Sequence, residues 1–123
     1  MDKKISRFTD LVTWQEAHKL VLSIYKITNQ FPSKEKFSLT SQIRRSAISL
    51  TSNIAEGFSR NTNKDKYQFY SVALGSLTEL QNQVFIARDV GYIKDEEFKK
   101  LVEQTIKIHK LINGLKKMKF SNT

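Results

Sequence analysis

The chain has 123 residues, of which 39% are hydrophobic and 27% are charged. This length suits a single domain covering residues 1–123, and the composition is typical of a globular protein rather than a disordered one. The chain contains no run of about 18 apolar residues, and no apolar leader follows its first seven residues, so we expect a cytoplasmic protein without a membrane-spanning helix. The absence of cysteine excludes a disulfide scaffold, a thiol nucleophile and a thiolate zinc site.

The first predicted helix covers residues 14–30. Thr13 and Glu16 have the spacing of a capping box, in which each side chain accepts a hydrogen bond from the first turn. Apolar residues then recur at steps of three and four, as they do on one face of a helix. Phe31-Pro32 ends this helix, because the residue before a proline is disfavoured in the α conformation.

Three more helices are predicted, at residues 38–60, 63–90 and 95–118. Thr62 and Asp65 resemble a second capping box, and Gly91 suits the position after the end of the third helix. The acidic run 95–97 marks the start of the fourth helix, where the helix dipole favours negative charge. Long helices joined by short loops predict an all-α fold, an antiparallel up-down-up-down four-helix bundle.

The third predicted helix has more apolar surface than a bundle needs. Phe85, Ile86 and Val90 lie outside its main apolar stripes, which favours self-association over scattered surface residues. Gly57 and Gly75 allow neighbouring backbones to approach closely. The second helix also has a face of small polar residues that suits a tight helix contact or a subunit interface.

Catalytic and metal-binding patterns are absent from the sequence. Neither His18 nor His109 has the glutamate spacing of a di-iron site, and no glycine-rich phosphate loop or nucleophile elbow is present. Glu56 and Glu79 are the one candidate acid–base pair, although Glu56 is better placed to pair with Arg60, and Glu79 with a cation on a neighbouring helix. We therefore predict no catalytic residues, no cofactor and no metal.

The formal net charge of +9 favours a polyanionic partner such as nucleic acid, although it also serves solubility alone. The fourth helix carries a row of five lysines opposite its apolar stripe, interrupted by one acid, Glu103, and Lys116 and Lys119 follow near the end of the chain. The helix dipole explains cations only in the last turn, whereas a row of lysines suits phosphate contacts. The predicted nucleic-acid-binding residues are Lys99, Lys100, Lys107, Lys110 and Lys117, with Arg44, Arg45 and Arg60 assisting.

Five ordered motifs carry a family resemblance: Trp14-Gln15-x-Ala17, Phe31-Pro32, Gln42-Ile43-Arg44-Arg45-Ser46, Ser49-x-x-Ser52-Asn53-Ile54-Ala55-Glu56-Gly57 and Gly75-Ser76-Leu77-x-Glu79-Leu80. The chain resembles the four-helix-bundle proteins encoded in intervening sequences of bacterial 23S ribosomal RNA genes. That group is similar in turn to the accessory protein of diversity-generating retroelements. The resemblance implies a homopentamer, no enzymatic activity and a role in binding nucleic acid, and the retroelement relatives also bind a reverse transcriptase.

Three functions remain open from the sequence. The leading hypothesis is a non-enzymatic oligomeric bundle that binds nucleic acid, RNA rather than DNA, through phosphate contacts. The alternative is an assembly or adaptor module whose basic surface docks an acidic protein such as a reverse transcriptase. The least favoured hypothesis is a nuclease that uses Glu56 and Glu79.

Overall fold

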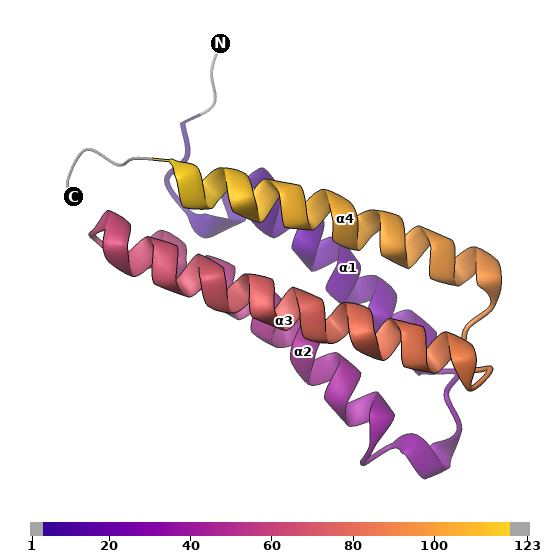
Figure 1. Cartoon of the computed structure of the whole chain (residues 1–123). Coiled ribbons are helices and arrows are strands. Elements are labelled where there is room, and N and C mark those ends of the chain that lie inside the picture. Colours follow the sequence, from indigo (N-terminus) through magenta and orange to yellow (C-terminus); the bar gives the residue numbers. More distant parts are fainter. Residues whose placement is uncertain (1–3, 119–123) are drawn as a thin grey trace.

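The structure, a computed structural model, describes residues 4–118 and consists mainly of four helices. These are α1 (Val12–Thr28), α2 (Leu39–Ser59), α3 (Asn63–Asp89) and α4 (Asp95–Lys117), with short 3-10 turns at Phe8–Asp10 and Ser33–Glu35. α1 and α3 each pack against both α2 and α4, so α1 lies diagonally across the bundle from α3 (Figure 1). The predicted all-α four-helix bundle is confirmed.

Both ends of α3 form as their sequence predicts. The hydroxyl of Thr62 accepts a hydrogen bond from the backbone N–H of Asp65 at 3.1 Å and caps the first turn. At the other end Gly91 has a φ of +87°, a conformation that favours glycine. The N–H of Tyr92 donates to the carbonyl of Ala87 at 2.8 Å and that of Gly91 donates to Arg88 at 2.9 Å, so two carbonyls of the last turn are satisfied.

The start of α1 differs from the prediction. The helix begins at Val12 and no side chain caps it, while Thr13 is buried. Glu16 does not reach back to the first turn, because its carboxylate binds the ammonium groups of Lys19 and Lys107. The capping box predicted at Thr13 is therefore wrong, since a partner on α4 competes for the glutamate.

The α2–α3 contact is the tightest part of the bundle. A Cβ atom at Gly57 would lie 2.5 Å from the ring of Tyr70, so only glycine allows this approach of α3 to α2. Ser49 and Ser76 share a hydrogen bond of 2.7 Å across the same contact. Gly75, by contrast, is exposed and a Cβ there would have no neighbour within 4 Å. Close approach is thus confirmed at Gly57 and wrong at Gly75 within this chain.

The apolar stripes read from the sequence form one continuous core. Every helix contributes, and the side chains that are 1% exposed or less include Leu20, Ile24, Ile43, Leu50, Ile54, Leu77, Leu80, Leu101, Ile108 and Ile112. Burial of these side chains supplies most of the driving force for folding. It also determines which side of each helix is turned outward.

Side chains also tie together the two ends of the bundle. At one end Lys66 donates to the carbonyl of Phe58 at 2.7 Å and caps the last turn of α2 from the first turn of α3. At the other end the hydroxyl of Tyr92 donates to Glu35 at 2.8 Å and joins the α3–α4 loop to the α1–α2 loop. Among the described helices, none combines the length and apolar character needed to span a membrane.

Candidate nucleic-acid interface

All five lysines of the predicted row are exposed on α4. They project outward because the opposite side of the helix is buried through Leu101, Ile108 and Ile112. Their surroundings differ, however, since α4 has α1 on one side and α3 on the other. Lys119, which the sequence adds to this basic region, lies outside the described residues.

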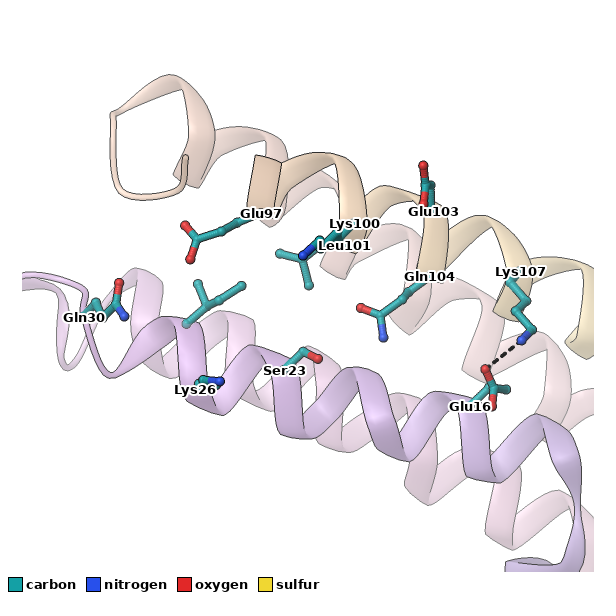
Figure 2. A pocket seen from close by; sticks show the side chains of 11 residues that line it. Glu16, Ser23, Lys26, Gln30, Glu97, Lys100, Leu101, Glu103, Gln104 and Lys107 are labelled. Atoms are coloured by element: carbon teal, nitrogen blue, oxygen red, sulfur yellow. Dashed lines mark ion pairs between the residues drawn. The ribbon is translucent and has the colours of Figure 1, made fainter. Parts of the chain in front are cut away.

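The side of α4 that faces α1 borders an open groove of about 590 Å³, which we call the α1–α4 groove (Figure 2). The ammonium group of Lys107 lies 2.9 Å from the carboxylate of Glu16 and forms an ion pair across it. Three glutamates and three lysines line the groove: Glu16, Glu97, Glu103, Lys26, Lys100 and Lys107. A phosphate group entering here meets as many carboxylates as ammonium groups.

The carboxyl group of Glu16 responds to these neighbours. Hydrogen bonds from Lys107 and then Lys19 lower its pKa below the ordinary value of 4.5. Lys107 is therefore already engaged at neutral pH. Four ion pairs are present within residues 4–118, and the pair between Lys107 and Glu16 is the one that includes a lysine of the row.

The outermost line of α4, opposite the buried Leu101, Ile108 and Ile112, has a different composition. Within residues 4–118, Lys99, Lys110 and Lys117 make no ion pair with a carboxylate. Between Lys99 and Lys117 the one acid on α4 is Glu103, which belongs to the lining of the α1–α4 groove. The positive charge of the row is consequently least compensated along this outward line of α4.

Arg44 has a structural role. Its guanidinium donates to the hydroxyl of Thr28 at 2.8 Å and to the side-chain oxygen of Asn29 at 3.1 Å. It also lies 4.6 Å from the ring centroid of Tyr25. These contacts hold the end of α1 against α2, so two of the five N–H donors of Arg44 are engaged within the bundle.

Arg60 is also engaged, whereas Arg45 is not. Arg60 binds Glu56 at 3.0 Å, as its spacing predicts, and stacks 4.4 Å from the ring centroid of Phe69. Arg45 is exposed and forms no ion pair in the described part of the chain. Glu79 is exposed too, and the ion pair predicted for it with a neighbouring helix does not form within that part. Of the three arginines, only Arg45 keeps its guanidinium available for a ligand.

Neither histidine belongs to a metal-binding arrangement among residues 4–118, where no group of three His, Asp or Glu residues could hold a metal ion. His18 stacks on Trp14 with ring centroids 4.6 Å apart, and His109 is exposed on α4.

Sequence reasoning missed the aromatic side chains that lie at the contact between α3 and α4. The ammonium group of Lys116 lies 4.6 Å from the ring centroid of Tyr67, and the ring of Phe98 meets that of Phe85 at 5.0 Å. Tyr67 and Phe85 are separated by five helical turns, so their spacing alone places them on one line of the third helix. The sequence could not show that α4 is the helix beside that line.

The fold and the lysine row define a small all-helical bundle with a basic side. A model of the 23S rRNA-intervening sequence protein family matches residues 9–114, and the chain therefore belongs to this family. The match includes four lysines of the row and ends before Lys117.

One solved structure supports the fold independently. It is the crystal structure of a protein of unknown function from the S23 ribosomal protein family of Bacteroides thetaiotaomicron, with 21% sequence identity and a TM-score of 0.80. The similarity covers 87% of this chain and 96% of that one. No protein with a curated description matches the chain. The similarity to the accessory protein of retroelements stays a prediction.

Proposed function

We propose that this protein is a non-enzymatic, self-associating helical bundle that binds nucleic acid, RNA in preference to DNA, by contacting phosphate groups. The proposal depends on one observation: three lysines of α4 are exposed and form no ion pair with a carboxylate of residues 4–118. These are Lys99, Lys110 and Lys117. These lysines extend over about 27 Å of helix, enough to follow several phosphates. The rRNA-related family supports RNA as the favoured ligand.

The other predicted residues contribute less in this proposal. Lys100 and Lys107 border the α1–α4 groove, where carboxylates weaken the attraction for phosphate. Arg44 and Arg60 already donate hydrogen bonds to side chains of this chain. Arg45 is therefore the predicted arginine that can assist the lysines in binding phosphate. Lysine contacts to phosphates position a nucleic acid without reading its bases, so we expect little sequence preference.

The test is charge reversal of the three carrying lysines. We expect Lys99→Glu/Lys110→Glu/Lys117→Glu to lower the affinity for a labelled RNA more than tenfold at low salt, because each lost phosphate contact removes released counterions. The slope of log affinity against log salt should fall by about 2 or more, since each contact to a single strand contributes about 0.7. Fluorescence anisotropy across a salt series measures both quantities.

A matched variant, Lys26→Glu/Lys34→Glu/Lys36→Glu, carries the same change in net charge on α1 and the following loop. This control variant should keep most of the affinity for RNA. Equal losses of affinity in the two variants would show that net charge alone, and not the lysines of α4, determines binding. Unchanged RNA binding in the α4 variant would contradict the proposal. Cleavage of the RNA on long incubation would favour a nuclease. A co-purifying protein that survives nuclease treatment would favour the adaptor function.

Self-association is the second part of the proposal, and the outward side of α3 supports it. The side chains of Val72, Ile86 and Val90 are 48%, 43% and 55% exposed. Exposed apolar side chains that lie together are typical of protein–protein interfaces. A second copy would bury these apolar side chains.

We expect Val72→Glu to reduce the native mass of the particle, as measured by light scattering on a sizing column after a nuclease and salt wash. Leu22→Glu, at a 56% exposed position on α1, is the control and should not change it. A wild-type protein that is monomeric at all concentrations would contradict self-association.

A further inference from the structure

The contact between α3 and α4 presents two exposed aromatic rings on its outer surface, which we call the α3–α4 seam. Tyr67 is 53% exposed and Phe85 is 44% exposed. The step of eighteen residues from Tyr67 to Phe85 makes five full helical turns, so both rings leave α3 in the same direction, about 27 Å apart. Two exposed aromatic rings on one line of a helix suit an extended ligand whose flat groups can stack on them.

Each ring contacts a side chain from α4. At one end of the seam, Lys116 places its ammonium group 4.6 Å from the ring centroid of Tyr67, and Lys117 follows it in the chain. At the other end, Phe98 contacts Phe85 at 5.0 Å, and Lys99 follows Phe98. Each end of the surface thus combines an exposed aromatic ring with a basic side chain, Lys116 at Tyr67 and Arg88 at Phe85.

The surface between these ends carries little negative charge. From Lys66 to Arg88, α3 has one acid, Glu79, which lies three residues after Ser76 and thus toward the α2 side, where Ser76 binds Ser49. Glu103 of α4 belongs to the α1–α4 groove. Asp89 is paired with Arg88 at 2.9 Å. A polyanion lying along the seam therefore meets several ammonium groups, with Glu103 as the one exposed acid of α4 between Lys99 and Lys117.

From this arrangement we propose that the RNA is bound single-stranded along the α3–α4 seam, with unpaired bases stacking on Tyr67 and Phe85 and phosphates meeting Lys99, Lys110 and Lys117. This inference rests on the proposed function and narrows its ligand. Stacking on a side chain requires a base face, which a duplex hides between neighbouring base pairs. Because every base has such a face, this mode of binding fits a protein without a base-reading element.

Tyr67 is the stronger of the two platforms. One face of its ring receives Lys116, and over half of the side chain remains open. Its hydroxyl makes no hydrogen bond within residues 4–118, so the side chain can adjust to a base. Phe85 is held more firmly, because Phe98 meets it edge-on and the guanidinium of Arg88 lies 5.2 Å from its ring centroid.

The test compares a single-stranded RNA oligomer with a blunt RNA duplex of the same length in the full chain, by fluorescence anisotropy at fixed salt. We expect the single strand to bind more tightly. Tyr67→Leu should weaken its binding about tenfold, the range of one lost stacking contact, and leave duplex binding unchanged. Tyr67→Phe should keep the affinity, because it keeps the ring. Ultraviolet cross-linking of a 4-thiouridine oligomer should map to the peptide that contains Tyr67.

The control variant is Phe37→Leu, which removes an aromatic ring that is 89% exposed in the loop before α2 and distant in sequence from the seam. It should leave RNA binding unchanged, and circular dichroism should show all variants folded. Equal affinity for single strand and duplex, or full affinity in Tyr67→Leu, would overturn the stacking inference while the phosphate-binding function still stands. If the wild-type protein bound neither the single strand nor the duplex, the proposed function itself would be overturned.

Discussion

The lysines of α4 lie in two different electrostatic environments, one beside α1 and one on the outward line of the helix. Toward α1, Lys100 and Lys107 border a groove in which three glutamates match three lysines, and Lys107 is paired with Glu16 at 2.9 Å. On the outward line of α4, Lys99, Lys110 and Lys117 have no carboxylate partner in the described residues. The neighbouring helix α3 carries the exposed aromatic rings of Tyr67 and Phe85. The same residue type on the same helix thus has two environments, decided by which neighbour each side meets.

The difference shows why a cation on a surface is not automatically a ligand site. An ammonium group close to a carboxylate gains less from a phosphate, because the phosphate must displace or share an existing partner. An ammonium group without such a partner keeps its full attraction, and an adjacent aromatic ring adds a stacking surface. The outward line of α4, next to the α3–α4 seam, is therefore the better candidate for nucleic acid.

The largest effect expected from this comparison comes from neutralising two lysines on one side at a time. Lys99→Gln/Lys110→Gln should lower the affinity for single-stranded RNA about tenfold and reduce the salt slope by about 1.4. Lys100→Gln/Lys107→Gln removes the same charge and should lower the affinity less than threefold. Filter binding across a salt series measures both, and equal losses would show that the two sides of α4 do not differ for RNA.

A smaller effect concerns the ion pair that joins α1 to α4. Surface pairs stabilise proteins by about 0.2–1 kcal/mol, so Glu16→Gln should lower the melting temperature at pH 7 by about 2 °C. The contacts with Lys107 and Lys19 lower the pKa of Glu16 in the folded state, and its contribution is therefore complete above the ordinary value of 4.5 and lost as pH falls through the lowered pKa.

The melting temperatures of wild type and Glu16→Gln should accordingly converge as the pH falls from 4.5 through the lowered pKa of Glu16. Differential scanning calorimetry at pH 7 and at pH 3 tests this convergence. Glu56→Gln is the matched control, because it breaks the Glu56–Arg60 pair within α2 and leaves the contact between α1 and α4 intact. A constant difference between wild type and Glu16→Gln at both pH values would show that the ion pair does not stabilise the α1–α4 contact.

Much of the fold was predictable because it depends on local chemistry. The stripe that buries Leu101, Ile108 and Ile112 follows from helical periodicity, and it also places the lysines outward. Gly91 and Thr62 end and begin helices through contacts within a few residues of themselves. Where a distant group competes, as Lys107 does for Glu16, local reasoning gave the wrong partner.

The candidate site was predictable only in part. The lysines could be found from one helix alone, whereas the engagement of Arg44 by Thr28 and Asn29 depends on how α1 and α2 pack. Tyr67 was overlooked because it is one exposed aromatic residue among several until α4 brings Lys116 to its ring.

By itself the sequence determined four amphipathic helices, their order and the outward direction of the basic residues, since the 3.6-residue period and the helix-end signals operate within a single segment. Only the tertiary structure decided which of those cations are compensated and which are not. Ion pairs and stacking contacts depend on distances of a few ångströms between residues far apart in the chain, and these distances arise when the helices pack.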